Sequence, residues 1–402
     1  MIAASVLGAA CAVPAPRPTT LLPMAETPRP KLTVALRKPT PSPSPFTQSG
    51  LAAELAIGYL DVSNAGSIGE FASTGTAIVY SSNFAEDADP EATPDLWRVI
   101  PDSVEPGPDL LWRNPARDHV LTRITGDLDT IAFVDMPVTG EAAWDLWLLP
   151  RGGDPILLDS HPGDPAVSGL VPSIAVYEPA IAWTAFDLGP AGPVSQLLTA
   201  SAPDWTPRVL EERQANESEL WLPSLYGNTI VYTEVVYAPD RQSDERHVYL
   251  SDIADPAVEP RRLDTSGLAT MPQIEGSVVV WKEADPGFNM FNWGRLMRYD
   301  LRTDELGPMH LGMHEYVNYP SLGSRFVAWW GSETSDFSLY DLGRGVTRSV
   351  ERHPPDGSTA ILRAHVAGDL VAWLAVDGEP NGGPASWQLR YATLPNIREL
   401  DR

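Results

Sequence analysis

One short pattern recurs seven times along this chain, at intervals of about fifty residues. In each copy a turn precedes a run of Ile, Val and Ala that ends on an aromatic residue, as in Gly276-Ser-Val-Val-Val-Trp281. The seven aromatic residues are spaced by 53, 50, 49, 49, 48 and 44 residues, and they are Tyr80, Phe133, Trp183, Tyr232, Trp281, Trp329 and Trp373. A repeat of this length is typical of a fold that packs successive copies of one supersecondary unit.

Each repeat contains the signals of four short strands. Pro223, Pro272 and Pro320 stand nine residues before the aromatic residue, and Pro172 stands eleven before it. A second segment with Leu and an aromatic residue follows, as in Leu339-Tyr340, and then a turn and a short outer strand. Apolar residues alternate with period two, and no sustained helical period occurs after residue 60.

A four-stranded unit that cannot bury both faces alone, repeated seven times, predicts an all-β, seven-bladed β-propeller. Six blades with an irregular flank at 71–118 are the alternative. Residues 51–60 are compatible with a short helix or with one more strand. The expected propeller domain is 47–402, with blades at approximately 66–118, 119–165, 171–213, 220–267, 269–313, 317–356 and 361–402.

The N-terminus has the features of a targeting signal rather than of a folded segment. Residues 1–11 contain a short apolar run with small side chains ahead of Cys11, which resembles an export signal with a lipobox-like end. Residues 12–46 are rich in Pro, Ser and Thr and predict a disordered tether. We therefore expect an extracytoplasmic protein, either secreted or lipid-anchored at Cys11 to a bacterial membrane. An exported protein with an incidental cysteine is the alternative.

The net charge of the chain limits the kinds of partner that it can bind. The chain carries 53 Asp and Glu against 28 Lys and Arg, a formal net charge of −25. This balance argues against nucleic-acid binding, which needs clustered cations, and against adhesion to an anionic lipid surface. The single cysteine excludes a disulfide framework and a thiolate metal cluster. We expect a monomer whose membrane contact is limited to the N-terminal anchor.

The repeats resemble the TolB-type propeller repeats of secreted bacterial proteins and the propeller part of prolyl oligopeptidases. The matching features are Pro272-x-Ile274-x-Gly276-x-x-Val279-Val280-Trp281 and Tyr299-Asp300-Leu301-x-Thr303. The resemblance covers residues 66–402 and implies a fold rather than an activity. The Ser-Pro-Asp-Gly turn of TolB is absent, so the resemblance does not imply a role in the Tol–Pal system.

The familiar catalytic motifs are missing. The sequence has no Gly-x-Ser-x-Gly elbow, Walker loop, His-Glu-x-x-His or Gly-x-Gly-x-x-Gly. His310 and His314 lie close in sequence, but on an extended segment that spacing favours a solvated loop over a metal site. We therefore predict no catalytic residues and no cofactor.

Carboxylates follow the motif aromatic in six repeats. They stand two or four residues after it and are Asp135, Asp187, Glu234, Glu283, Glu333 and Asp377. If they lie in the loops after the strands, they form an acidic rim that binds a cation or a basic partner. Ordinary solvated loops in an acidic protein are the alternative.

Two loops add further candidates. The first repeat contains Asp87, Asp89 and Glu91, which are candidate ligands of Ca²⁺. The fifth repeat contains Phe288, Phe291 and Trp293 in one insertion, which predicts either a contact surface for a partner or a plug over the channel.

These features favour a non-catalytic binding or scaffold module that recognises a protein or glycan through its loop face. The alternative is a carbohydrate-active enzyme, a glycoside hydrolase or lyase, with carboxylates at the mouth of the channel.

Overall fold

The computed structural model describes most of the chain after residue 56. The described residues are 57–61, 67–83, 94–101, 108–116, 118–138, 143–163, 171–239, 244–284, 294–309, 311, 317–330, 337–351, 359–377 and 386–394. Every regular element within them is a β-strand, and none of them forms a helix. None of these residues therefore belongs to a helix of the length and hydrophobicity needed to cross a bilayer.

The strands form seven antiparallel sheets of four, which are the seven blades. Blade 1 is β2 (Ser67–Ser73), β3 (Ile78–Asn83), β4 (Leu96–Val99) and β5 (Asp109–Trp112). Blade 2 is β6 (His119–Asp127), β7 (Thr130–Pro137), β8 (Ala143–Leu149) and β9 (Ile156–Pro162). Blade 3 is β10 (Ile174–Tyr177), β11 (Ala180–Gly189), β12 (Gly192–Ser201) and β13 (Arg208–Gln214).

The remaining blades follow the same order. Blade 4 is β14 (Ser218–Tyr226), β15 (Thr229–Val236), β16 (Glu245–Asp252) and β17 (Arg261–Arg262). Blade 5 is β18 (Ala269–Glu275), β19 (Val278–Ala284), β20 (Gly294–Asp300) and β21 (Glu305–Pro308). Blade 6 is β22 (Asn318–Leu322), β23 (Phe326–Trp330), β24 (Phe337–Asp341) and β25 (Val346–Glu351). Blade 7 is β26 (Thr359–Ala367), β27 (Leu370–Asp377), β28 (Ser386–Thr393) and β1 (Ile57–Asp61).

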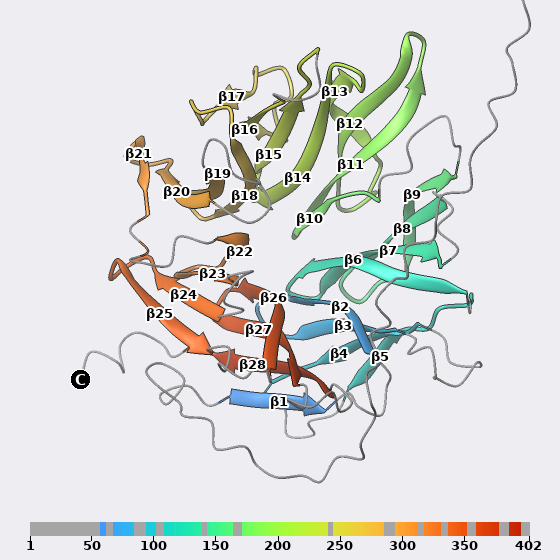
Figure 1. Ribbon diagram of the computed structural model, residues 1–402. Coiled ribbons are helices and arrows are strands. Elements are labelled where there is room, and N and C mark those ends of the chain that lie inside the picture. Colours follow the sequence, from blue (N-terminus) through green and yellow to red (C-terminus); the bar gives the residue numbers. More distant parts are fainter. Residues whose placement is uncertain are drawn as a thin grey trace, which may run out of the picture.

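The blades stand around one axis, with the first strand of each blade innermost (Figure 1). Blade 7 closes the ring with strands from both ends of the propeller. Strand β1 pairs antiparallel with β28, from Ile57 opposite Ala392 to Asp61 opposite Gln388. The predicted seven-bladed propeller is thereby confirmed, the six-bladed alternative is excluded, and the segment that was ambiguous in sequence supplies a strand at 57–61.

The core consists of seven apolar clusters, one between each pair of neighbouring blades. The motif aromatics are at most 2% exposed. Each packs against the preceding blade, as Trp183 does against Trp144 and Leu146, and Trp373 against Phe337 and Leu339. Burying a large aromatic side chain removes 150–250 Å² of surface from water, so this residue is the main apolar contact that each repeat makes with its neighbour.

A β-bulge interrupts the inner strand of most blades. In blades 2, 4, 5 and 6 two inner-strand residues lie opposite the single motif aromatic, and they are Arg123-Ile124, Leu222-Pro223, Met271-Pro272 and Tyr319-Pro320. Proline lacks the N–H donor of a regular ladder, and it fits where the ladder is already broken. The recurring proline of the sequence motif therefore marks the bulge.

Candidate functional site

Three of the predicted rim carboxylates lie inside strands rather than in loops. Asp135 belongs to β7, Glu234 to β15 and Glu283 to β19, and all three are buried. The second strand of each of these blades continues past the motif aromatic, so a residue two positions further on is still paired with both neighbouring strands.

Each of these three carboxylates already has a partner. Arg213 Nε and Ser218 Oγ donate to Glu234 Oε1 at 2.9 and 2.8 Å. Arg295 lies 3.0 Å from Glu283 Oε1. Asp135 Oδ1 lies 3.0 Å from both Asn114 Nδ2 and His119 Nδ1. Among the described residues no contact joins two of these carboxylates, so each holds strands together locally.

The other predicted site residues are dispersed. Asp187 is exposed near the end of β11, and Asp377 is the last residue of β27. The remaining candidates lie outside the described residues, and they are Cys11, Asp87, Asp89, Glu91, Phe288, Phe291, Trp293, His310, His314 and Glu333. Within the described part of the chain, His, Cys, Asp and Glu side chains form no group of three or more suited to a metal ion.

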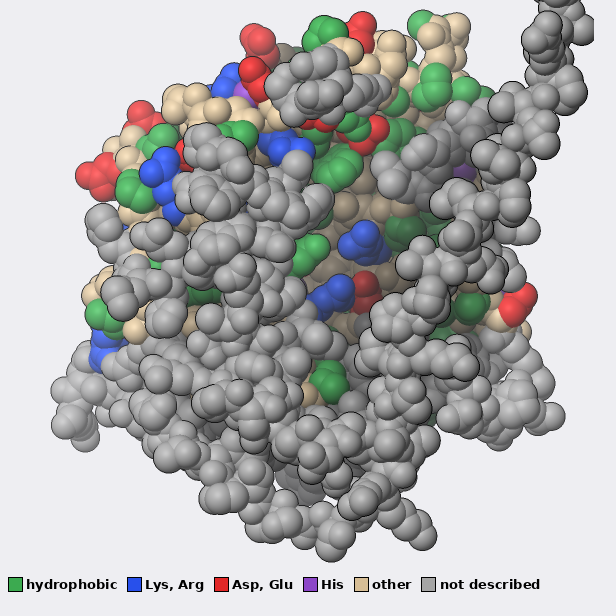
Figure 2. Space-filling model, in the orientation of Figure 1, with side chains coloured by type: hydrophobic (Ala, Val, Ile, Leu, Met, Phe, Trp, Pro, Cys, Tyr) green, Lys and Arg blue, Asp and Glu red, His purple; other side chains and the backbone are tan. Residues whose placement is uncertain are grey.

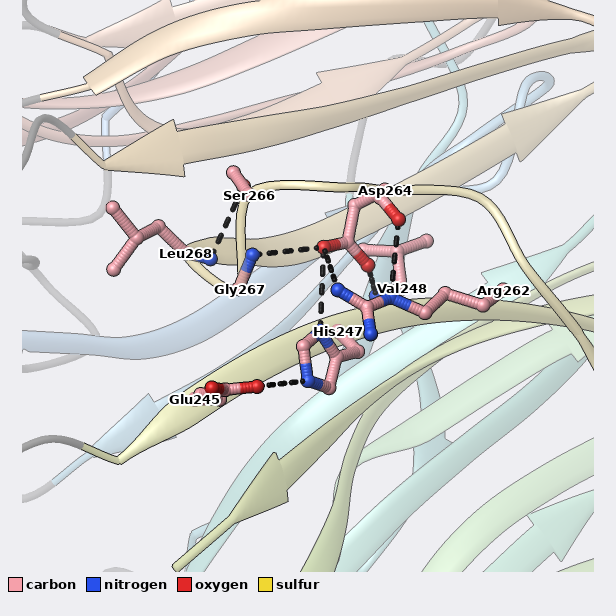
Figure 3. Close-up of polar contacts among 8 residues, drawn as sticks. All are labelled: Glu245, His247, Val248, Arg262, Asp264, Ser266, Gly267 and Leu268. Atoms are coloured by element: carbon pink, nitrogen blue, oxygen red, sulfur yellow. Dashed lines mark hydrogen bonds and ion pairs between the residues drawn. The ribbon is translucent and has the colours of Figure 1, made fainter. Parts of the chain in front are cut away.

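A buried polar cluster in blade 4, which sequence reasoning did not identify, surrounds His247 (Figure 3). His247 Nδ1 lies 3.3 Å from Asp264, and Nε2 lies 2.9 Å from Glu245. Asp264 also accepts the backbone N–H groups of Val248 and Gly267 at 2.9 and 3.1 Å. Both ring nitrogens are therefore occupied, and the cluster fixes the connection between blades 4 and 5 instead of offering a free base.

A group of polar side chains from several blades lies at the turns between the first and the second strand of each blade. These turns are at the end of the channel opposite to the expected acidic rim. The residue six positions before the motif aromatic ends the inner strand or begins the turn in every repeat, and the seven are Thr74, Asp127, Tyr177, Tyr226, Glu275, Gly323 and Ala367. Neighbouring turns touch around the axis, since Leu128 donates its N–H to Thr74 O at 2.9 Å. Blades 2 to 5 carry large polar side chains here, whereas blades 6, 7 and 1 carry small ones.

The four large side chains, Asp127, Tyr177, Tyr226 and Glu275, define what we call the turn mouth. Tyr177 interacts electrostatically with the other three, and its ring centroid lies 4.5 Å from that of Tyr226. Asp127 Oδ2 accepts the N–H of Glu178 at 2.9 Å. The four side chains therefore converge although they come from four blades.

The turn mouth perturbs its titratable groups. Burial, reinforced by the negative charge of Asp127, raises the pKa of Glu275 to about 7. Burial also raises the pKa of Asp127, while the N–H groups of Glu178 and Leu128 oppose this shift. Desolvation and a hydrogen bond with Tyr226 raise the pKa of Tyr177 to about 12. Near neutral pH the mouth thus combines one carboxyl group that retains a proton with a second that accepts hydrogen bonds.

A hydrogen-bond acceptor without a donor among the described residues belongs to Glu178, the residue whose N–H donates to Asp127. Glu178 Oε2 is buried and has no hydrogen-bond partner within the described structure. A buried carboxylate oxygen without a donor is costly, and such groups are common where a ligand supplies the missing hydrogen bond. No Lys or Arg acts on Glu275 or Asp127 among the described residues, so the turn mouth favours a ligand that develops positive charge.

Sequence reasoning missed the turn mouth, although a signal was present. The prediction followed the residues after each motif aromatic, whereas the converging residues stand at a constant position before it. Asp127, Tyr177, Tyr226 and Glu275 occupy that position in four successive repeats.

Comparisons with known proteins yield matches in structure alone. No protein-family model matches the sequence, and no curated protein matches it. A prolyl endopeptidase structure matches with a TM-score of 0.55 and 13% identity, over 79% of this chain and 48% of that chain. Oligogalacturonate lyase in complex with manganese matches with a TM-score of 0.51 and 12% identity, over 86% of this chain and 92% of that chain.

A third match is the β-propeller domain of the trilobed protease from Pyrococcus furiosus, described as having an open velcro topology. Its TM-score is 0.55 at 12% identity, over 82% of this chain and 95% of that domain. The chain spans about half the length of the prolyl endopeptidase. These likenesses confirm the resemblance to oligopeptidase-type propellers at the level of the fold.

The comparisons also correct the functional prediction. The sequence led us to expect a non-catalytic binding or scaffold module and no enzyme activity, and this prediction is wrong. The three similar structures named above are a prolyl endopeptidase, an oligogalacturonate lyase and a domain of a protease, all of which are enzymes or belong to one. Identities of 12–13% establish a common fold alone, so the activity of this chain depends on its own residues.

Proposed function

We propose that this protein is a carbohydrate-active enzyme that hydrolyses a glycosidic bond at the turn mouth. The observation that carries the proposal is that burial and the negative charge of Asp127 in blade 2 raise the pKa of Glu275 in blade 5, although the two residues come from opposite sides of the axis. Glycoside hydrolysis requires such a pair, one protonated and one ionised, on either side of the scissile bond.

The two carboxyl groups take different roles because their surroundings differ. Glu275 keeps its proton up to about pH 7 and donates it to the glycosidic oxygen as the C–O bond breaks. Asp127 remains the acceptor, held by the N–H group of Glu178, and it activates water or attacks the anomeric carbon. The net reaction adds the proton to the leaving oxygen and the hydroxyl of water to the anomeric carbon.

The remaining residues of the mouth suit a sugar. Tyr177 and Tyr226 form a contiguous aromatic pair beside the carboxyl groups, and aromatic faces pack against the apolar faces of sugar rings. Glu178 Oε2 is an acceptor for a sugar hydroxyl. An oxocarbenium-like transition state gains stabilisation from the surrounding carboxylates, which cations would oppose.

The structural matches support a carbohydrate substrate over a peptide. The match to a peptidase covers about half of a prolyl endopeptidase or the propeller domain of a protease, whereas oligogalacturonate lyase matches along nearly its full length. The sequence also lacks the Gly-x-Ser-x-Gly elbow of a serine peptidase.

Elimination is the second candidate, because the match to oligogalacturonate lyase favours it. A lyase removes the proton beside a uronate carboxylate and needs a cation to stabilise the resulting negative charge. The turn mouth offers carboxylates instead, so hydrolysis fits its electrostatics better.

The test is a panel of neutral and acidic oligosaccharides incubated with the protein, followed by analysis of the products. Hydrolysis releases a new reducing end with no double bond, and elimination leaves an unsaturated sugar that absorbs ultraviolet light. We expect Glu275→Gln and Asp127→Asn each to lower kcat by at least about 100-fold. Glu305→Gln, an exposed change on the outer strand of blade 5, is the matched control and should leave kcat unchanged.

Cleavage that persists in both variants would refute the assignment of these residues. Unsaturated products would show that the reaction is an elimination and not a hydrolysis.

A further inference from the structure

A second set of seven residues shares one position of the inner strands, four residues before the turn mouth. It consists of the residues ten positions before the motif aromatics, which are Glu70, Arg123, Ser173, Leu222, Met271, Tyr319 and Arg363. In blades 2, 4, 5 and 6 this residue is the first of the bulge pair and has a positive φ, between 44° and 56°. The left-handed backbone is disfavoured for residues with a side chain, and such strain often accompanies ligand sites.

Arg123 is an exposed residue on the innermost strand of blade 2. Its strand β6 pairs with β7 on the outer edge and packs against β2 and β10 of the neighbouring blades. Arg123 lies in the middle of the strand and is nevertheless exposed, and the channel is the open space left to it. No described residue forms an ion pair or a side-chain hydrogen bond with it, although the chain has 53 acidic residues.

Arg363 approaches the same place from the opposite side of blade 1. Its guanidinium Nη1 lies 3.2 Å from Glu70 Oε1, and its side chain stays 44% exposed. Glu70 Oε2 accepts the N–H of Ile124 at 3.3 Å, directly beside Arg123. One carboxylate is therefore already held between blades 7 and 2, which shows the kind of group that this part of the channel accommodates.

The region around Arg123 and Arg363 carries positive charge, whereas the protein as a whole is acidic. Figure 2 shows Lys or Arg side chains beside an Asp or Glu side chain in the recessed middle of one face of the ring. Arg123 and Arg363 outnumber Glu70, so the ring has an excess of positive charge inside a protein of net charge −25. Field lines are focused by the low-dielectric walls of a channel, which strengthens the attraction for an anion.

Tyr319 adds an aromatic surface at the same level. It occupies the equivalent position in blade 6 and is 50% exposed. Tyr319 and Arg363 hold the same position in the inner strands of blades 6 and 7, which contact each other. A guanidinium and an aromatic ring in this arrangement suit a sugar that carries a carboxylate, because the first binds the charge and the second packs against the ring.

We propose that the channel binds an acidic oligosaccharide, with Arg123 and Arg363 holding the carboxylate of one sugar unit. This inference rests on the proposed function, since it defines a subsite for the same substrate. The two rings are four residues apart along the inner strands, which is at most about 13 Å. A sugar chain that reaches the turn mouth therefore extends past the arginines.

The experiment measures binding separately from cleavage. Glu275→Gln/Asp127→Asn protein is titrated by calorimetry with an α-1,4-linked galacturonic acid trimer and with the neutral galactose trimer of the same linkage. We expect the acidic trimer to bind at least 10-fold more tightly, and added salt to reduce the preference. Arg123→Gln should abolish the preference, and Arg123→Lys should restore part of it.

Arg151→Gln is the matched control, because Arg151 is an exposed arginine of the same blade outside the channel. It should change neither affinity by more than twofold. Equal affinity for the two trimers, or a preference that survives Arg123→Gln, would overturn the proposal. Inorganic phosphate that competes as strongly as the trimer would also overturn it, because the site would then recognise charge without sugar.

The binding and cleavage results are independent. An acidic preference without any cleavage by the unmodified protein would refute the catalytic proposal and leave the anion subsite standing. Cleavage of neutral and acidic substrates at equal efficiency, together with equal binding, would refute the anion subsite and leave the catalytic proposal standing.

Discussion

Glu275 and Asp127 interact across the axis of the propeller, one at the end of strand β18 and the other at the end of β6. Each ends the inner strand of its own blade, and the two blades are as far apart around the ring as seven blades allow. The inner strands of a propeller converge on the axis, so their ends are the places where distant repeats approach one another.

The first prediction concerns pH and stability. Because burial raises the pKa of Glu275 from 4.5 to about 7, the folded state favours its protonated form. The stability of the protein should therefore fall as pH rises from about 4.5 to 7, and Glu275→Gln should remove this loss. We expect the variant to match the parent at pH 4.5 and to exceed it by about 1–3 kcal/mol at pH 8, after allowance for solvent screening.

Denaturant unfolding at several pH values measures this difference. Glu305→Gln is again the control, because Glu305 is exposed. A constant difference between Glu275→Gln and the parent across this range would mean that Glu275 titrates normally.

The second prediction concerns ring closure. Strand β1 covers the outer edge of β28, which is otherwise an unpaired sheet edge. A protein starting at residue 67 should therefore have a lower Tm and a greater tendency to aggregate than one starting at residue 57. Thermal unfolding and light scattering of the two proteins test this, and equal Tm values would show that the pairing adds little.

The third prediction concerns the interface aromatics. Trp373 is fully buried and packs on Phe337 of blade 6, with ring centroids 5.1 Å apart. Trp373→Ala should lower the free energy of unfolding by about 3–5 kcal/mol. Leu306→Ala, at a position 43% exposed on an outer strand, should change it by less than about 0.5 kcal/mol. Similar losses in both variants would contradict the assignment of the core.

The fourth prediction concerns a strained turn beside the candidate site. Leu128 has φ 52° and is 43% exposed, so its side chain gains little from burial while its backbone is disfavoured. Leu128→Gly should stabilise the protein by up to about 1 kcal/mol. Leu157→Gly provides the comparison, since Leu157 is 49% exposed in strand β9 and glycine weakens a strand. The two changes should have opposite signs in the same unfolding assay.

The fold could be predicted from the sequence because the residues that determine it are close together in the chain and recur in every repeat. The alternation of Ile and Val before each aromatic predicts a strand that is buried between blades, and the structure confirms this at Trp183 and Trp281. The proline nine residues earlier was visible as a pattern, although its physical reason, the bulge opposite the aromatic, needed the strand register.

The candidate site was less accessible. Asp135, Glu234 and Glu283 were expected on a common rim, but each is paired within its own surroundings, and the cation of Glu234 is Arg213 from the preceding blade. The pairing partner of a carboxylate depends on side-chain contacts between strands that are distant in sequence, and a repeat pattern does not specify them.

The sequence by itself determined the number of blades, the strands within them and the aromatic residues that seal each interface, because burial with period two is a property of short segments. The tertiary structure decided which polar residues meet. Asp127, Tyr177, Tyr226 and Glu275 share one position in the repeat. The raised pKa values of Asp127, Tyr177 and Glu275 arise only when the closed ring brings four blades to one mouth and removes water from it. Electrostatic interactions depend on distance and desolvation, and both are set by the closure of the ring.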